Sequence, residues 1–112
     1  MSEYNYDAKK DQGKLRMDLI PPEALEGIAE VLTFGAEKYG ENTWRKVEKE
    51  RYIAALLRHY AAYMHDHKSV DEESGILHIK HLLCNAVFLM CMEVADEKRK
   101  EANGQAMQHH SV

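Results

Sequence analysis

Residues 75–92 read GILHIKHLLCNAVFLMCM, and this stretch decides the fold. Apolar side chains occupy nearly every face of a helix drawn through it. The segment from about Gly75 to Lys100 is therefore predicted to be a helix packed on several sides. Three polar residues in it, His78, His81 and Asn85, fall within about 60° of one another on the helical wheel. The sequence thus predicts a central apolar helix that carries one polar stripe.

Two more helices are predicted before this one. The first runs from Glu23 to Tyr39, after the Pro21-Pro22 pair that favours a helix start and before Gly40, a common helix stop. The second runs from Glu50 or Arg51 to about His67. The helical period gives the inward residues as Leu25, Ile28, Ala29, Leu32, Ala36 and Tyr39 on the first helix, and Ile53, Leu56, Leu57, Tyr60 and Met64 on the second.

The chain is predicted to be all-α, with three main helices in one domain. Residues 1–20 form a polar arm, residues 21–100 the helical domain, and residues 101–112 a polar tail expected to be frayed. Three helices, one of them apolar all round, leave too much apolar surface for a monomer of 112 residues. We therefore expect a homo-oligomer, a dimer or tetramer, that completes a helical bundle.

Composition excludes several classes of partner. The net charge is −4, so the chain has no general attraction to nucleic acid polymers or anionic membranes. We find neither a signal-peptide pattern nor a run of about 18 apolar residues expected to span a membrane. Cys84 and Cys91 lie about two turns apart on one helix face, too far for a disulfide. A reducing, cytoplasmic location is the expectation, in the host if the chain is phage-encoded.

The polar stripe needs partners. A buried imidazole or amide left unsatisfied costs about 1–3 kcal/mol. A ligand, a metal ion or a partner side chain would satisfy it, and a His-x-x-His spacing is compatible with metal binding. The alternative is that each histidine bonds a backbone carbonyl or a carboxylate and only fixes the helix register. Both interpretations stay open on sequence grounds.

Carboxylates gather at two places. On the first helix one face carries Glu23, Glu26, Glu30 and Glu37. The i, i+4 pair Glu26 and Glu30 can share a divalent cation, or the face can simply be solvated. Phe34 lies on the same face, which suggests that another chain covers part of it. The turn DEESG at residues 71–75 places further acids just before His78, where they either cap the helix or join a site.

Basic residues suggest a polyphosphate ligand. Arg51, Arg58 and His65 repeat every seven residues on the second helix, beside small alanines. Arginine forks bind phosphate oxygens, although surface salt bridges are an equal alternative. Lys14 and Arg16 in the arm either close over phosphates or are solvated. Trp44 either stacks on a base or anchors its loop. The pair His65-Asp66 is typical of HD phosphohydrolases, but we reject that class because the preceding histidine, His59, lies on the same helix.

Several ordered blocks resemble a phage-enriched family, the dATP/dGTP diphosphohydrolase N-terminal domains, also called MazZ-like. The blocks are DQGKLRMDLIPPEAL (11–25), VLTFGAEKYG (31–40), NTWRK (42–46), Arg58-His59 and DEESG (71–75), followed by His78, His81 and Asn85. The family is related to the MazG-like all-α nucleoside triphosphate pyrophosphohydrolases. The resemblance covers roughly residues 11–90.

This resemblance implies a MazG-like helical oligomer that hydrolyses a nucleoside triphosphate, with dATP and dGTP expected, to the monophosphate and pyrophosphate. It implies Mg²⁺ or Mn²⁺ held by carboxylates, which would activate a water. The residues expected to hold metal are Glu26, Glu30, Asp71 and Glu73. Those expected to act in catalysis are Glu26, Glu30, His78, His81 and Asn85, and those expected to contact substrate are Lys14, Arg16, Lys38, Trp44, Arg58 and His59. The alternatives are a non-catalytic nucleotide-binding or regulatory oligomer and a purely structural assembly.

Two features depart from the pattern of relatives. The MazG-like motif Glu-Glu-x-x-Glu is not intact, because the first helix offers Glu26 and Glu30 without an adjacent acidic pair. Lys68 also stands three residues before Asp71, where an acid is expected in relatives. If Lys68 replaces a metal ligand, activity would be weaker or the substrate different.

Overall fold

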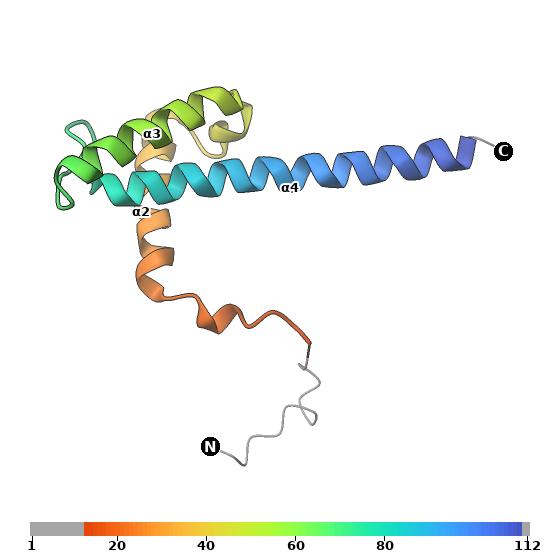
Figure 1. Ribbon diagram of the computed structural model, residues 1–112, viewed down its shortest axis with the longest axis horizontal. Coiled ribbons are helices and arrows are strands. Elements are labelled where there is room, and N and C mark those ends of the chain that lie inside the picture. Colours follow the sequence, from red (N-terminus) through yellow and green to blue (C-terminus); the bar gives the residue numbers. More distant parts are fainter. Residues whose placement is uncertain (1–12, 111–112) are drawn as a thin grey trace, which may run out of the picture.

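The computed structural model describes residues 13–110, with side chains described as far as Gly104. The chain forms a 3-10 helix η1 (Met17–Leu19), α2 (Pro22–Tyr39), a 3-10 helix η2 (Thr43–Lys46), α3 (Lys49–His65) and α4 (His78–His110). The first half of α4 runs antiparallel to α3, α2 crosses this pair at a steep angle, and the second half of α4 projects beyond both (Figure 1). The all-α prediction is confirmed, and no strand occurs between residues 13 and 110.

Local sequence explains where α2 begins and ends. Pro22 occupies a first-turn position, where its missing N–H costs nothing, and Pro21 precedes it in an extended conformation. At the other end Gly40 has φ 96°, and its N–H donates to the Ala36 carbonyl at 2.8 Å. The predicted helix over 23–39 is confirmed to within one residue.

The inward faces of α2 and α3 differ from those predicted. On α2 the buried residues are Gly27 and Val31, whereas the predicted inward residue Leu25 is 55% exposed. On α3, Leu57 is 56% exposed. The predicted stripes leave most of their members exposed: Leu25, Ala29 and Tyr39 on α2, and Ile53, Leu57, Tyr60 and Met64 on α3.

Close packing explains why α2 turns a different face inward from the one predicted. Gly27 lies against the side-chain stem of Lys80, and a Cβ at this position would stand 3.4 Å from Lys80 Cγ. α2 therefore contacts α4 along the Gly27–Val31 face, with room at Gly27 for a side chain no larger than a methyl group. Phe34 lies on this side too and packs against the core of its own chain. The suggestion that another chain covers part of the acidic face of α2 stays a prediction.

Aromatic packing explains why α3 also turns a different face inward from the one predicted. Tyr52 lies tilted against Phe88 of α4, with ring centroids 4.8 Å apart. His59 stacks on His81 about two turns along. Tyr52 and His59 are both partly polar, and a count of apolar residues alone passes over them.

The core lies where α4 meets the other two helices. Its buried apolar members are Val31, Ile76, Cys84 and Phe88. His81 and Asn85, only 9% and 6% exposed, are the buried polar residues beside them. The prediction that the polar stripe turns away from solvent is confirmed for these two. Cys84 and Cys91 are both free thiols, as their spacing indicated.

α4 begins and ends later than predicted. It starts at His78 rather than near Gly75, because Gly75 adopts φ 71° and Val70 pairs with Leu77 in an antiparallel bridge. At the other end the helix continues to His110, past the expected end near Lys100.

Much of the surface of α4 is apolar and uncovered within one chain. The helix from His78 to Gly104 is long and apolar enough, by length and composition, to cross a membrane, which the sequence analysis did not expect. The core helix of a helical bundle passes the same test, and only 17% of the relevant window is buried inside this chain. The rest of the described chain therefore leaves most of this surface uncovered.

Candidate functional site

A tight turn between α3 and α4 positions the first part of the site. The Asp71 N–H donates to the Ile76 carbonyl at 2.8 Å, and the Gly75 N–H donates to the Asp71 carbonyl at 2.7 Å. The His78 N–H is bound by the Ser69 carbonyl at 3.0 Å. The left-handed φ of Gly75 favours glycine at this position. The turn thereby fixes Asp71 and Ser74 beside the first two turns of α4.

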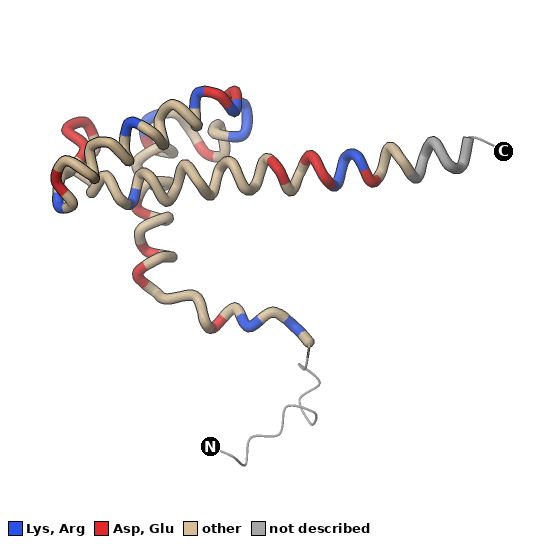
Figure 2. Tube along the Cα trace, viewed as in Figure 1, with Lys and Arg blue, Asp and Glu red and all other residues tan. Residues whose placement is uncertain are grey.

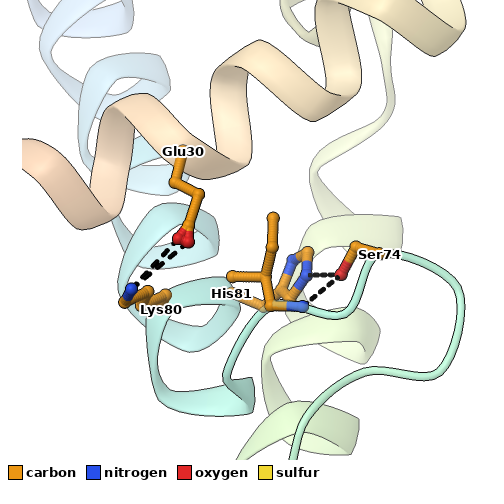
Figure 3. Close-up of polar contacts among 5 residues, drawn as sticks. Glu30, Ser74, Lys80 and His81 are labelled. Atoms are coloured by element: carbon orange, nitrogen blue, oxygen red, sulfur yellow. Dashed lines mark hydrogen bonds and ion pairs between the residues drawn. The ribbon is translucent and has the colours of Figure 1, made fainter.

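Ser74 links the turn to the polar stripe. Its backbone N–H and its hydroxyl donate to Asp71 Oδ1 at 2.9 and 3.1 Å. Its Oγ also lies 2.7 Å from His81 Nε2 and accepts from the Ile76 N–H at 3.2 Å (Figure 3). Because a hydroxyl has one hydrogen and a carboxylate is the stronger acceptor, we assign that hydrogen to Asp71. The His81 Nε2–H then donates to Ser74.

Three imidazoles meet next to this turn. His59 Nδ1 and His78 Nδ1 are 2.8 Å apart, and the ring of His59 stacks on His81 with centroids 4.7 Å apart and an interplanar angle of 10°. One donor atom each from His59, Asp71 and His78 falls in a group in which all atoms lie within 4.8 Å of one another. Within the described part of the chain, this is the group of donor atoms close enough together to hold a metal ion.

The local environment sets the charges of this cluster. Burial, together with the neighbouring His81 and His78, lowers the pKa of His59 to about 4. Burial also lowers the pKa of His81, although Asp71 acts against this. For Asp71, burial acts to raise the pKa, but the hydrogen bonds from Ser74 outweigh it and the pKa is lowered. Near neutral pH the cluster therefore combines neutral His59 and His81 with an ionised Asp71.

Asn85 is satisfied within its own helix. Its Nδ2 donates to the backbone carbonyl of His81 at 2.8 Å. The amide nitrogen of Asn85 therefore bonds a main-chain group, as the alternative interpretation of the polar stripe predicts. His81 is instead tied to a side chain, Ser74, and His78 to another imidazole.

A cavity of about 840 Å³ opens beside the stripe. It lies between α2, η2, α3 and α4, and His81 and Asn85 form part of its wall. Arg51 and Arg58 line it as well, from the stripe on α3 that suggested a polyphosphate ligand. The remaining lining is mostly apolar or aromatic, including Phe34, Trp44, Tyr52 and Phe88. Such a wall, apolar with a few convergent polar groups, is typical of small-molecule sites.

Trp44 serves as an anchor in this structure. Its ring stacks on Phe88, with centroids 4.6 Å apart, and packs against the core. The Arg45 guanidinium lies 4.3 Å from the ring centroid. The Trp44 carbonyl accepts the Tyr52 hydroxyl at 2.7 Å, which ties η2 to α3. A contact of Trp44 with a base stays a prediction.

The predicted metal-binding carboxylates do not converge within one chain. Glu30 accepts two hydrogen bonds from Lys80 Nζ, at 3.0 and 3.2 Å (Figure 3). Glu73 forms an ion pair with Lys38, so two residues assigned to different roles neutralise each other here. Glu26 is exposed on α2. Only Asp71 lies among other donor groups, and those are histidines.

The described part of the arm, residues 13–20, contributes nothing to the cavity wall. Lys14 is exposed, and Arg16 is bound to Asp18 through two hydrogen bonds of 2.8 Å. Figure 2 shows the described part of the arm leading away from the α3–α4 pair. Residues 1–12 of the arm lie outside the described residues. A substrate contact by Lys14 or Arg16 stays a prediction.

Two features of the cluster were missed on sequence grounds. The sequence predicts His59 at the substrate but not beside His78, and it gives Ser74 no part in the site. The signal for the first was present: His59 lies near the end of one predicted helix and His78 near the start of the next. Antiparallel helices joined by a short connection bring such positions together.

The chain belongs to the family described as dATP/dGTP diphosphohydrolase, N-terminal, which matches residues 4–102. The expectation from the quoted blocks is therefore confirmed. A protein named dATP/dGTP diphosphohydrolase from Salmonella phage PMBT28 is 33% identical over 100 residues, covering 84% of this chain. The matched region is 33% of that relative, so the chain spans about a third of its length. The comparison with solved structures found no match.

Proposed function

We propose that this chain binds a purine deoxynucleoside triphosphate, dATP or dGTP, in the cavity and hydrolyses it to the monophosphate and pyrophosphate with the help of a divalent metal ion. The observation that carries the proposal is the cavity wall, where buried His81 and Asn85 stand beside Arg51 and Arg58. The cavity volume falls within the range of small-ligand sites, about 300–1,000 Å³. The name of the phage relative supports the reaction.

The two arginines suit the charged end of the ligand. Arg51 and Arg58 lie two turns apart on α3 and both line the cavity. Guanidinium groups bind phosphate oxygens through two parallel hydrogen bonds. The aromatic and apolar part of the wall suits the nucleoside. We therefore assign the phosphates to the α3 side of the cavity.

His81 is the group best placed to take a proton. Burial keeps it neutral near pH 7, and its Nε2–H is held by Ser74, which is bound in turn to the anionic Asp71. A neutral imidazole oriented in this way can accept a proton from a water that attacks phosphorus. Asp71, acting through Ser74, would stabilise the charged imidazole that forms.

The metal part of the proposal is limited by the ligands present. Mg²⁺ prefers oxygen ligands in octahedral geometry, and in one chain Glu30 and Glu73 are held by lysines. The set Glu26, Glu30, Asp71 and Glu73 therefore does not fit Mg²⁺ as arranged in one chain. Its use, or that of Mn²⁺, remains an expectation to be tested.

We also propose that the chain works as a homo-oligomer, a dimer or tetramer. The support is the uncovered apolar surface of all three helices, which includes Leu25, Leu57, Tyr60, Met64 and Met90. Sedimentation without detergent measures the mass directly. A dimer or tetramer is expected, whereas a monomer, or a protein that needs detergent, would contradict this part of the proposal.

The central experiment is a pyrophosphate-release assay with each of the four deoxynucleoside triphosphates, with Mg²⁺ or Mn²⁺ and then with EDTA. We expect release with dATP and dGTP that stops on chelation. Arg58→Gln should weaken it, and Glu30→Gln should be compared with the control Glu37→Gln on the same helix. No release with any triphosphate would overturn the enzymatic proposal.

One observation favours a second candidate, a nucleotide-binding module without catalysis. The chain corresponds to only a third of its phage relative, so catalytic groups of that protein can lie in the other two thirds. Equilibrium binding of dATP or dGTP separates the two candidates. Tight binding without pyrophosphate release would support the module, and neither binding nor release would leave a structural role.

A further inference from the structure

One group of potential metal ligands in the described chain differs from the carboxylate set expected for magnesium. His59 Nδ1 and His78 Nδ1 face each other at 2.8 Å, and a carboxylate oxygen of Asp71 completes a group within 4.8 Å. Two nitrogens and one oxygen come from three places in the chain: α3, the turn and the start of α4. We propose that His59, Asp71 and His78 form a binding site for a divalent transition-metal ion of the zinc type.

The distances suit such an ion after small adjustments. Zinc binds histidine nitrogens and carboxylate oxygens at about 2.0–2.2 Å, so the ligand atoms of a tetrahedral site stand about 3.3–3.5 Å apart. The two imidazole nitrogens lie slightly closer than this, and the carboxylate oxygen lies within 4.8 Å of both. Rotations of the side chains about χ1 and χ2 would bring all three to the required spacing.

The surroundings prepare the donors for a cation. A metal ligand must be deprotonated, and the hydrogen bonds from the Ser74 N–H and hydroxyl keep Asp71 ionised. Both of these bonds reach Oδ1, which leaves Oδ2 without a hydrogen bond from Ser74. His59 is half-buried and neutral near pH 7, so a lone pair is available on its ring. Ser74 thus acts as the outer partner that orients a ligand.

The competing arrangement is a hydrogen bond between two neutral imidazoles. At 2.8 Å one Nδ1 can carry the proton and the other can accept it. That arrangement uses the two histidines and leaves the carboxylate of Asp71 with its hydrogen bonds from Ser74. A cation uses all three groups and balances the charge of Asp71.

The donor set also predicts which ions bind. Imidazole ligands favour zinc, copper, iron and nickel, whereas magnesium takes carboxylates, carbonyls and water. Three protein ligands leave a fourth position open, as in catalytic rather than structural zinc sites. His81, which stacks on His59 and lines the cavity, connects the site to the proposed substrate. The inference thus deepens the proposed function, but binding of the ion does not depend on hydrolysis.

The test is a metal titration of the full chain after removal of metal with EDTA. Because His109 and His110 could bind ions adventitiously, the background is the double variant His109→Ala/His110→Ala. Co²⁺ is followed by its visible absorption, and Zn²⁺ by its displacement of Co²⁺. We expect one site per chain, with no competition from Mg²⁺ at similar concentrations.

Variants assign the ligands. His59→Ala, His78→Ala and Asp71→Asn should each weaken Co²⁺ binding by at least about 100-fold, since loss of an outer partner alone costs about 10–100-fold. The control is His65→Ala, an exposed histidine on the same helix as His59, and it should leave binding unchanged. Circular dichroism checks the helical content of each variant.

A measurement on the His109→Ala/His110→Ala protein, with all three proposed ligands intact, covers the case in which a ligand variant fails to fold. Addition of Zn²⁺ should shift the ¹⁵N resonances of the Nδ1 atoms of His59 and His78 and leave those of His65 in place. No binding by the background protein, or binding that survives both histidine variants, would overturn the proposal. Zn²⁺ binding without pyrophosphate release would keep the metal site and reject the enzyme, and release without Zn²⁺ binding would do the opposite.

Discussion

Replacing Ser74 by alanine should destabilise the fold far more than the loss of one surface hydroxyl. The Ser74 Oγ lies 3.1 Å from Asp71 Oδ1, 2.7 Å from His81 Nε2 and 3.2 Å from the Ile76 nitrogen. His81 is only 9% exposed, so its Nε2–H would lose its partner in a place that water reaches poorly. An unsatisfied buried donor costs about 1–3 kcal/mol, and an ordinary hydrogen bond contributes about 0.5–1.5 kcal/mol.

The expected loss in the free energy of unfolding is therefore about 2–3 kcal/mol. For a domain of this size that corresponds to a fall in Tm of about 10–20 °C. The matched control is Ser69→Ala in the same connection, whose hydroxyl bonds the Asp66 carbonyl at 2.7 Å. Water can replace that bond, so the control should lose about 1 kcal/mol or less. Urea denaturation of both variants measures the difference.

A double-mutant cycle isolates the contact between Ser74 and His81. If the Oγ–Nε2 bond holds the stripe to the turn, the losses for Ser74→Ala and His81→Ala should be non-additive by about 1 kcal/mol or more. Additive losses, or a Ser74→Ala variant no less stable than Ser69→Ala, would refute the reasoning. Both outcomes are readable from the same denaturation curves.

Three further predictions follow from other residues. Burial raises the pKa of Cys84 to about 11, so iodoacetamide should modify Cys91 first and Cys84 only on unfolding, as read by mass spectrometry. By urea denaturation, Gly75→Ala should lower the free energy of unfolding by about 1–2 kcal/mol, because Gly75 has a left-handed φ. Gly27→Ala should raise it by about 0.4–1 kcal/mol, because Gly27 lies in a helix with room for a Cβ. The opposite order of stabilities would contradict the assigned backbone. Arg58→Gln should raise the KM for dATP by about 10-fold or more, from the loss of about 1.5–3 kcal/mol of charged hydrogen bonding, and an unchanged KM would remove Arg58 from the phosphate site.

The number and order of helices could be predicted from periodicity, but their inward faces could not. Leu25 and Leu57 follow the helical period of core residues yet stand more than half exposed. The contacts that orient the helices come from Gly27, which has no side chain, and from His59, which is polar. Hydropathy patterns give such residues little weight, and they also take no account of the surfaces left for other chains.

The candidate site could also be predicted only in part. His81 and Asn85 stood out because they interrupt an apolar helix, and the structure confirms that both are buried. The pairing of Glu30 with Lys80 could not be foreseen, since it joins residues 50 positions apart on helices that cross. Ser74 was hidden because its role depends on the three-dimensional path of the turn, which Gly75 sets.

The connection between α3 and α4 has a consequence for how this family can diversify. The imidazole–carboxylate cluster is built from that hairpin alone, whereas Val31, Leu32 and Phe34 of α2 line the neighbouring cavity and take no part in the cluster. Substitutions on α2 can therefore reshape the space offered to a ligand without disturbing the cluster. The cluster and the α2 part of the cavity wall thus lie on separate segments, and each can change while the other is kept.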